Sequence, residues 1–259
     1  MKTLIAMAMA SALLLGGCAQ RTDAPELRVF AAASLTETLS AVAEQYKTVA
    51  PGVALRFSFD SSGTLQRQIE EGADCDLFLS AAPKQMDALA DAGLIDGKTR
   101  VDLLENAVAL VVPEGNPKNI RSYDDLVSAL RRGDVLLAMG GADVPVGQYT
   151  RRIFDYYGLS GEELAAKGVL TYGSNVKEVA AQVGEAAVDC GIIYQTDAYS
   201  AHLTVVDTAA AELCGQVLYP AAVLKNAAHA REAAAFLAYL QGPEAAAVFE
   251  GAGFTSLTK

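Results

Sequence analysis

The feature that most constrains this chain is a regular alternation of short apolar runs with amphipathic segments, from residue 26 to residue 252. LRVFAA at 27–32 reads as a buried strand, whereas residues 35–49 place apolar side chains at helical spacing. Such alternation is typical of parallel sheets covered by helices on both faces. The runs are too many for one sheet in 259 residues, so we expect an α/β fold of two similar lobes of mainly parallel sheet, joined by a hinge.

The same pattern predicts the individual elements and the lobe limits. Strands are expected at 27–32, 53–59, 76–80, 107–112, 135–139, 169–172, 190–194, 203–207 and 216–224. Helices are expected at 35–49, 64–71, 84–91, 123–131, 147–157, 176–185, 228–240 and 243–252. The chain would leave the first lobe near Glu105 and return near Tyr219. The first lobe would then hold residues 26–104 and 220–259, and the second residues 105–219.

The N-terminus has the features of a secretory signal peptide, residues 1–17. Lys2 precedes an apolar stretch that is too short to span a bilayer. The pair Gly16–Gly17 before Cys18 resembles a bacterial lipobox, which implies cleavage before Cys18 and a lipid on its sulfur. Residues 18–25 would be the anchored linker. We therefore expect an extracytoplasmic protein, held on the outer face of the cell membrane or periplasmic, with ordinary secretion as the alternative.

Charge and cysteine content narrow the possible partners. Loss of Lys2 with the signal changes the formal net charge from −11 to −12, and no basic cluster is present, so nucleic acid is not an expected partner. An anion would need local donors. Cys75, Cys190 and Cys214 form no CxxC pair, which argues against zinc or thiol redox chemistry. We expect buried apolar thiols, with a Cys190–Cys214 disulfide as the alternative.

Polar turns follow four of the predicted strands, and each turn precedes a helix. They contain Ser34, the pair Ser61–Ser62, the sequence VPVG at 144–147 and the sequence SNV at 174–176. In open α/β sheets, ligands bind at the carboxyl ends of the strands. Each helix N-terminus there offers unpaired N–H groups and the positive end of its dipole. The four turns, two from each lobe, therefore predict an anion site in the cleft between the lobes.

Simpler roles exist for several of these residues. Ser34 and Glu37 have the S-x-x-E spacing of a capping box, and Ser122 has similar spacing to Asp125 without a place in the cleft. Two cations near the turns, Arg67 and Lys177, are expected to lie on solvated helix faces.

Seven segments in order resemble the molybdate-binding proteins of bacterial ABC importers. They are FAAASLTETL, FDSSGTLQRQIEEGADCDLFLSA, VPVGQY, NVKEVAAQV, GIIYQTDA, YPAAVL and FLAYLQGPEAAAVFEGAGF, within residues 26–254. The resemblance implies the type II fold of periplasmic binding proteins. It implies an oxyanion, molybdate or tungstate, held by the residues Ser34, Ser62, Val146, Val176 and Tyr194, with backbone amides serving at the two valines. We expect a monomer without a cofactor, whose partners are the oxyanion, the importer permease and the membrane.

Two residues depart from the family pattern. Asp60 precedes the double serine, where a carboxylate facing the cleft would repel a dianion, so we expect it to point away. Gly63 replaces a further serine, which leaves its backbone amide available.

Donors alone suit molybdate and tungstate, which carry four acceptor oxygens and no proton. Binding of sulfate, phosphate or a small organic anion is the alternative within the same class. An enzyme is the competing class. The only histidines, His202 and His229, lie outside the turns and in no GxSxG or HExxH motif, so the sequence argues against catalysis.

Overall fold

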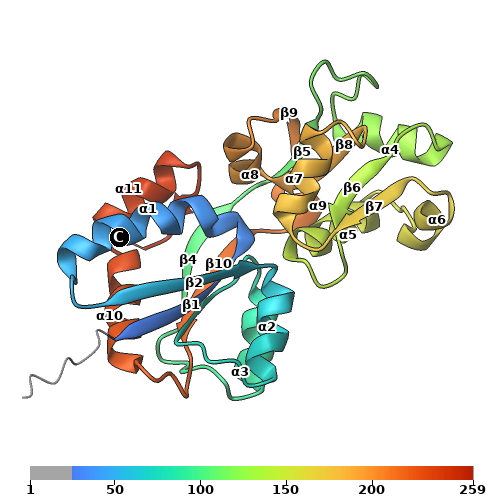
Figure 1. The fold of residues 1–259 in the computed structure, drawn as a ribbon. Helices are drawn as coiled ribbons and strands as arrows, with labels where there is room; N and C mark the ends of the chain where they lie inside the picture. Colours follow the sequence, from blue (N-terminus) through green and yellow to red (C-terminus); the bar gives the residue numbers. More distant parts are fainter. Residues whose placement is uncertain (1–24, 259) are drawn as a thin grey trace, which may run out of the picture.

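The computed structural model describes residues 25–258, which fold into two α/β lobes (Figure 1). One sheet has the strand order β11-β4-β10-β3-β1-β2, and the other has the order β7-β6-β8-β5-β9. Helices flank both sheets, so the predicted two-lobed fold class is confirmed. The predicted signal peptide and Cys18 lie outside the described residues. Within residues 25–258, no helix combines the length and apolarity that crossing a bilayer requires.

The first lobe contains the N-terminal and C-terminal parts of the described chain. Its strands are β1 (Glu26–Ala32), β2 (Ala54–Asp60), β3 (Leu77–Leu79), β4 (Val101–Asn106), β10 (Val217–Val223) and β11 (Thr255–Ser256). Its helices are η1 (Ala33–Leu35), α1 (Thr36–Val49), α2 (Ser62–Glu70), α3 (Pro83–Asp91), α10 (Ala230–Leu240) and α11 (Pro243–Gly251). The last four residues of β1 are all buried, because helices cover both faces of this central strand.

The second lobe is formed by the middle of the chain. Its strands are β5 (Val108–Val112), β6 (Leu137–Gly140), β7 (Leu170–Gly173), β8 (Cys190–Tyr194) and β9 (Thr204–Thr208). Its helices are α4 (Tyr123–Arg132), α5 (Pro145–Tyr156), α6 (Gly161–Ala166), α7 (Val176–Gly184), α8 (Gln195–Ser200) and α9 (Ala211–Cys214). Every residue of β5 and β8 is buried, which explains why their sequences are apolar without alternation.

Both sheets are mixed, so the expectation of mainly parallel sheets is wrong in that respect. Strand β1 pairs in parallel with β2 and β3, and β6 pairs in parallel with β7 and β8. Strand β10 is antiparallel to β3 and β4, and β5 is antiparallel to β8 and β9. The reason is the chain path: β5 and β10 each arrive from the other lobe. Strand β5 starts beside the end of β8, and β10 starts beyond the end of β3, so both pairings are antiparallel.

The chain crosses between the lobes at two places, each next to the end of a strand of the first lobe. Strand β4 ends at Asn106 and β5 begins at Val108. On the return, α9 ends at Cys214 and β10 begins at Val217, which is paired with Asn106 in the first sheet. The expected limits of 105 and 219 therefore fall inside β4 and β10, because these two strands continue to pair with each other up to the hinge.

The three described cysteines are free and buried. The expectation of buried apolar thiols is thus confirmed, and the alternative of a Cys190–Cys214 disulfide is wrong. Burial raises the pKa of the Cys75 and Cys190 thiols to about 12, so neither side chain is ionised at neutral pH.

Candidate functional site

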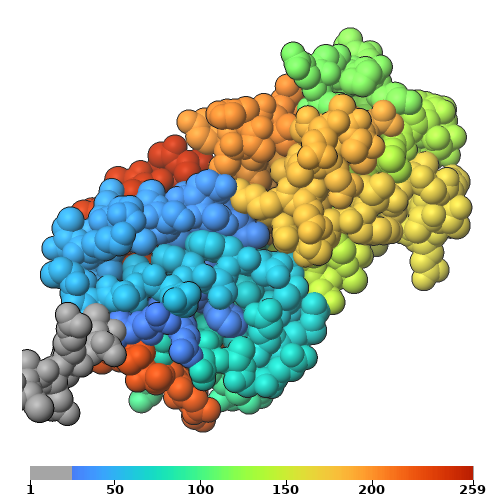
Figure 2. Space-filling model, viewed as in Figure 1, coloured from blue at the N-terminus to red at the C-terminus, as the bar shows by residue number. Residues whose placement is uncertain are grey.

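A cavity between the lobes brings all five predicted site residues together. Its lining is Ala32, Ala33, Ser34, Asp60, Ser61, Ser62, Ala81, Val144, Pro145, Val146, Val176 and Tyr194. Its volume is about 10 Å³, roughly the room that one water molecule needs. In the space-filling view the first lobe, in blue and cyan, meets the yellow part of the second (Figure 2). A larger solute would therefore require the lobes or the lining side chains to move apart.

Ser34 faces this cavity from η1, the short turn between β1 and α1. It is buried, and its Oγ lies 3.0 Å from the hydroxyl of Tyr219. No side chain caps η1 or α1, so the capping-box interpretation of Ser34 is wrong. Ser122 does cap α4, because its Oγ accepts the N–H of Asp125 at 3.2 Å. The two serines have similar sequence spacing, but the extra 3-10 turn carries Ser34 away from the helix end.

Ser62 is the first residue of α2, and the preceding serine performs the capping. The Oγ of Ser61 accepts the N–H of Thr64 at 3.1 Å. This leaves the Ser62 side chain free to reach across to the loop after β3, where its Oγ accepts the N–H of Ala81 at 2.9 Å. Because a backbone N–H can only donate, the hydroxyl hydrogen of Ser62 is left for the cavity.

The second lobe presents backbone N–H groups at the starts of α5 and α7. The N–H groups of a helix's first turn have no acceptor within the helix. In α5, Pro145 at the first position has no N–H and no side chain caps the helix, so Val146 carries the first donor. In α7, Asn175 accepts the N–H groups of Lys177 and Glu178, which leaves that of Val176 unused by the cap. Both valines act through the main chain, which their side chains could not reveal.

Tyr194 closes β8 at the floor of the cavity. Its side chain is 1% exposed and contacts the rings of Tyr149 and Tyr219 edge-on. Its hydroxyl donates to the carbonyl of Ala81 in the other lobe at 3.3 Å. Burial raises the pKa of Tyr194 well above its ordinary value, so the hydroxyl keeps its hydrogen at any physiological pH. In this arrangement that hydrogen is directed to Ala81, and a bound anion would compete for it.

Asp60 lines the cavity, contrary to the expectation that it points away. Its Oδ1 accepts the N–H of Ser61 at 2.6 Å, so one carboxylate oxygen is held by its own chain neighbour. This bond occupies a backbone donor beside the site and places a negative charge near it.

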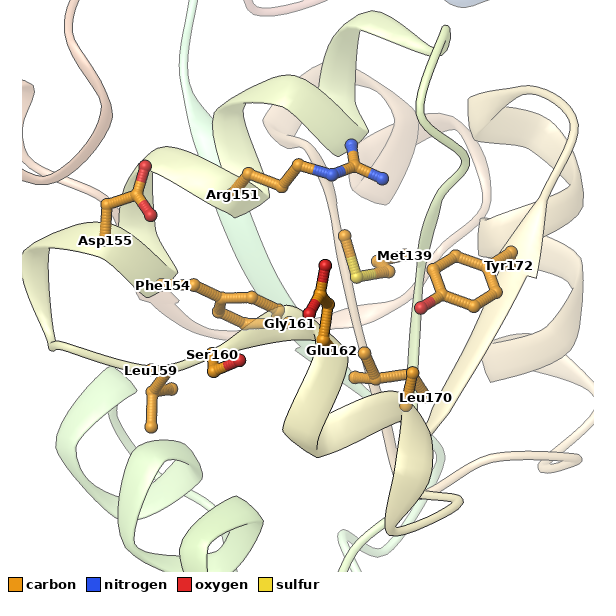
Figure 3. Close-up of a pocket in the computed structure, with 11 residues that line it drawn as sticks. Met139, Arg151, Phe154, Asp155, Leu159, Ser160, Gly161, Glu162, Leu170 and Tyr172 are labelled. Atoms are coloured by element: carbon orange, nitrogen blue, oxygen red, sulfur yellow. The ribbon is translucent and has the colours of Figure 1, made fainter.

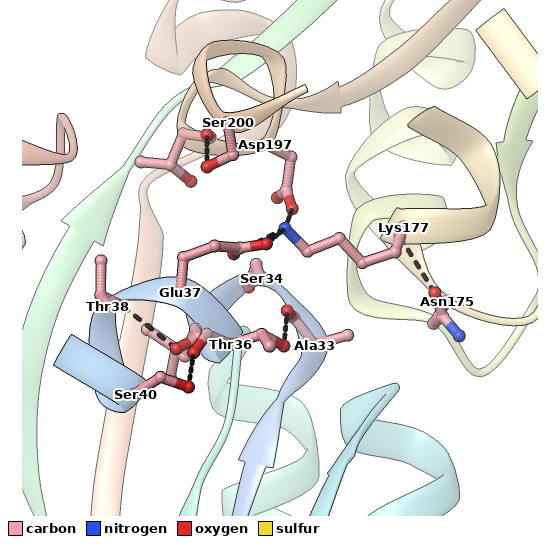
Figure 4. Close-up of polar contacts among 12 residues, drawn as sticks. Ala33, Ser34, Thr36, Glu37, Thr38, Ser40, Asn175, Lys177, Asp197 and Ser200 are labelled. Atoms are coloured by element: carbon pink, nitrogen blue, oxygen red, sulfur yellow. Dashed lines mark hydrogen bonds and ion pairs between the residues drawn. The ribbon is translucent and has the colours of Figure 1, made fainter. Parts of the chain in front are cut away.

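Two ion pairs join the lobes at the cleft. Arg67 stays half-exposed, as expected of a solvated helix face, whereas Lys177 is largely covered and the expectation is wrong for it. Arg67 of α2 contacts Asp143, in the loop before α5, at 2.6 Å. Lys177 of α7 lies 2.8 Å from the carboxylate of Glu37 in α1 and 3.1 Å from that of Asp197 in α8 (Figure 4).

The carboxylate of Asp197 is fully buried. Burial raises its pKa to about 6, although the nearby Lys177 acts to lower it. For Lys177, burial acts to lower the pKa, but the carboxylates of Asp197 and Glu37 outweigh it and the pKa is raised. Lys177 is therefore charged and committed to two carboxylates, one from each lobe.

A close backbone approach accompanies these ion pairs. A Cβ atom on Gly63 would lie 2.1 Å from the carbonyl oxygen of Asp143. Only glycine permits this distance, since real Cβ contacts are never so short. The departure from the family pattern at Gly63 is thus linked to the close contact between α2 and the loop of the other lobe.

A larger cavity, of about 540 Å³, lies inside the second lobe among α5, α6 and β7 (Figure 3). None of the five predicted residues lines it. Its one cation, Arg151, donates to the carbonyls of Gly141 and Gly147 at 3.3 and 2.9 Å and so stabilises the start of α5.

The sequence did not point to three residues that organise the site: Tyr219, Asn106 and Ala81. Tyr219 and Asn106 lie in the paired strands at the hinge, where Asn106 Nδ2 donates to the Tyr219 hydroxyl at 3.2 Å. Tyr219 begins the segment YPAAVL, whose sequence indicates no role for a side chain. Ala81 acts only through its main chain.

The geometry of the lobes and of the cavity defines a class of protein. Two α/β lobes, connected by two crossings, meet over a small cavity lined by hydroxyls and helix N-termini, as in a binding protein that encloses a small solute. Among residues 25–258, no group of three or more histidine, cysteine or acidic side chains could hold a metal ion. The chain belongs to the family of bacterial extracellular solute-binding proteins, whose model matches residues 27–255.

Individual relatives agree with this assignment. The chain is 37% identical to the molybdate-binding protein ModA of Escherichia coli, over 90% of both proteins. It is 33% identical to YvgL of Bacillus subtilis, described as an ABC transporter substrate-binding lipoprotein, over 96% of both. The periplasmic molybdate-binding protein of Azotobacter vinelandii shares the fold, with a TM-score of 0.76 and 22% identity over 88% of this chain and 98% of that one.

Proposed function

We propose that the protein binds molybdate or tungstate between its lobes and delivers it to the permease of an ABC importer. The observation that carries the proposal is the donor set around the cavity. Ser34 and Ser62 offer hydroxyls, Val146 and Val176 offer backbone N–H groups, and Tyr194 offers a phenol. No lysine or arginine lines the cavity, which agrees with binding through hydrogen bonds and helix dipoles. Relatives named as molybdate-binding proteins support the choice of anion.

The chemistry of the anion matches these donors. Molybdate and tungstate are dianions at neutral pH, and each hydrogen bond to an ionised group contributes roughly 1.5–3 kcal/mol net. Five such bonds contribute about 7.5–15 kcal/mol, which spans the roughly 8–12 kcal/mol of a micromolar to nanomolar complex and leaves a surplus for desolvation and closure only at its upper end. Hydrogenphosphate carries a proton that needs an acceptor. The five proposed ligand groups are placed to donate, and the one carboxylate that lines the cavity, Asp60, already accepts the N–H of Ser61 with one oxygen. A phosphate proton that faces the donors is left unpaired, which costs roughly 1–3 kcal/mol. Sulfate has no such proton, so only cavity size would exclude it.

Isothermal titration with molybdate, tungstate, sulfate and phosphate tests the proposal. We expect one molybdate or tungstate per chain and a higher melting temperature with the anion, since a ligand at a hundredfold excess over Kd stabilises the native state by about 2.7 kcal/mol. Tight binding of sulfate or phosphate with no response to molybdate would assign the site to another oxyanion. The proposal includes no catalytic step, and His202 and His229 do not line the cavity.

The anchor and the oligomeric state belong to the same proposal. We infer that Cys18 carries a lipid that holds a monomer on the outer face of the membrane, as the lipobox-like sequence before it and the description of YvgL as a lipoprotein support. The Cys18→Ser variant should then be uncleaved or released. Its recovery at mature size in the membrane fraction would contradict the anchor, and light scattering checks the monomer.

A further inference from the structure

A chain of buried hydrogen bonds leads from the hinge to Ser34. Asn106 is the last residue of β4, and its Oδ1 accepts the N–H of Ala107, the residue that joins the two lobes, at 2.8 Å. Its Nδ2 donates to Thr196 Oγ1 of the second lobe at 2.9 Å and to the Tyr219 hydroxyl at 3.2 Å. The Tyr219 hydroxyl lies 3.0 Å from Ser34 Oγ. Ser34, which faces the cavity, thus ends a series that begins at the crossing.

The groups at the hinge end, Ala107 N–H and the Asn106 amide, determine which partner donates in each hydrogen bond of the series. A backbone N–H only donates, so the Ala107 bond fixes which end of the Asn106 amide is oxygen. The remaining NH2 only donates, so the Tyr219 oxygen accepts, and its own hydrogen is available to Ser34 Oγ. When Ser34 accepts that hydrogen, its hydroxyl hydrogen is free to point into the cavity. The opposite direction would commit the Ser34 hydrogen to Tyr219 and turn a lone pair toward a bound anion.

Ser62 shows the same arrangement with simpler chemistry. The N–H of Ala81 donates to Ser62 Oγ on the side away from the cavity. Ser62 must accept there, so its own hydroxyl hydrogen can be donated on the cavity side. Ser34 and Ser62 thus each have a hydrogen-bond partner on the side away from the cavity, a tyrosine hydroxyl for Ser34 and a main-chain N–H for Ser62.

We propose that Tyr219 and Asn106 are positioning residues that fix Ser34 as a donor, and that they thereby make the site select anions without a proton over hydrogenphosphate. The inference rests on the proposed function, because it concerns the same cavity. Neither residue lines the cavity, so both act through Ser34. Without them, the Ser34 hydroxyl can rotate and offer a lone pair to the proton of hydrogenphosphate.

The test compares Tyr219→Phe with Tyr123→Phe in the full-length protein. Tyr219→Phe keeps the ring contacts with Tyr194 and Phe254 and removes only the hydroxyl. Tyr123 is equally buried, in α4 of the second lobe, and its hydroxyl has no hydrogen-bond partner among the described residues. The readouts are the Kd for molybdate and, by competition at pH 8, the Kd for inorganic phosphate, which is then a dianion that carries one proton.

We expect Tyr219→Phe to weaken molybdate about fivefold to tenfold, the effect of one hydrogen bond, and to lower the ratio of phosphate Kd to molybdate Kd by at least as much. Tyr123→Phe should leave both constants unchanged. Asn106→Asp is the second variant, because a carboxylate would accept the Tyr219 hydrogen and reverse the series. The added negative charge weakens the binding of both dianions. The ratio of phosphate Kd to molybdate Kd is therefore the quantity to compare, and a fall in that ratio indicates that the series is reversed.

The outcomes separate the two proposals. If the wild-type protein does not bind molybdate, the proposed function fails. If it binds and Tyr219→Phe behaves like Tyr123→Phe, the positioning role alone is wrong. A Tyr219→Phe variant with weaker molybdate binding but an unchanged Kd ratio also overturns it, because the tyrosine would then only support the fold.

Discussion

At the scale of single residues, the role of a side chain depends on the groups to which it is hydrogen-bonded. Ser34 and Ser122 precede acidic residues at similar spacing, yet Ser34 meets the buried hydroxyl of Tyr219 whereas Ser122 caps α4. A motif that describes only neighbours in sequence cannot tell these environments apart. Burial can, since Ser34 is 4% exposed whereas Ser122 is only partly buried.

The variants Ser34→Ala and Ser122→Ala turn this difference into a prediction. Ser34→Ala removes a donor from a desolvated dianion, so molybdate affinity should fall by roughly 1.5–3 kcal/mol, or about 10- to 150-fold. Ser122→Ala should cost about 1 kcal/mol of unfolding free energy and leave affinity intact. Titration and thermal unfolding of both variants measure the two quantities. Equal affinities would remove Ser34 from the proposed site.

At the scale of elements, the start of α2 is shaped for contact with the other lobe. Gly63 sits in its first turn against the carbonyl of Asp143, and Arg67 one turn later pairs with the carboxylate of the same residue. Because their partners lie in different lobes, the backbone contact and the ion pair would be lost if the lobes moved apart.

We predict that Gly63→Ala hinders closure without unfolding the lobe. Alanine is a better helix former than glycine by about 1 kcal/mol, so stability should not fall, whereas the clash with Asp143 should weaken molybdate about tenfold or more. Titration gives the affinity, and small-angle X-ray scattering at saturating molybdate should show a larger radius of gyration than in the wild type. Gly161→Ala is the control, since nothing lies within 4 Å of a Cβ at that helix start. Wild-type affinity in Gly63→Ala would show that the contact is not needed.

Much of the element pattern follows from the sequence, because each predicted strand and helix is specified by local periodicity. Several elements are missed, among them α6, whose Ser160 cap is local, and two others show a different cause. Strand β4 mixes charged and apolar residues at a sheet position between β10 and β11, and α8 begins directly at the cavity after Tyr194. Both depend on partners far away in sequence.

The convergence of the four polar turns on one cavity could be predicted, because the carboxyl ends of strands in such sheets lie at the same edge, whereas the choice of Val146, Val176 and Tyr194 follows only from the family resemblance. The Tyr219–Ser34 contact could not, since 185 residues separate its partners and packing alone brings them together. Nor could the ion pairs of Arg67 and Lys177, because nothing near either cation in the sequence identifies a carboxylate in the opposite lobe.

At the scale of the whole molecule, Lys177 connects charges of both lobes beside the cleft. Its two carboxylate partners differ in environment: Glu37 is half-exposed, while Asp197 is fully buried. The buried carboxylate is the one whose ionisation folding opposes, since its pKa rises from 3.8 to about 6. Asp197 therefore stabilises the folded state more in acid than at neutral pH.

This gives a prediction with a definite sign. Between about pH 4 and pH 6 the folded state holds more protons at Asp197 than the unfolded state, so this group's contribution to stability is largest below pH 4 and is lost as pH rises through 6. The wild-type free energy of unfolding should fall relative to Asp197→Asn by on the order of 2 kcal/mol across that range. Urea unfolding of both proteins at several pH values provides the measurement. A constant difference would show that Asp197 titrates normally.

The rates at which the buried thiols react can report how fast each lobe opens. Cys75 belongs to the first lobe, while Cys190 and Cys214 belong to the second, and all three are shielded from solvent in the folded chain. A thiol reacts with an alkylating reagent as the thiolate, so each stays silent until its surroundings open and its pKa returns to the ordinary range. Mass spectrometry of timed alkylation would therefore measure the opening rates of the two lobes separately in one sample.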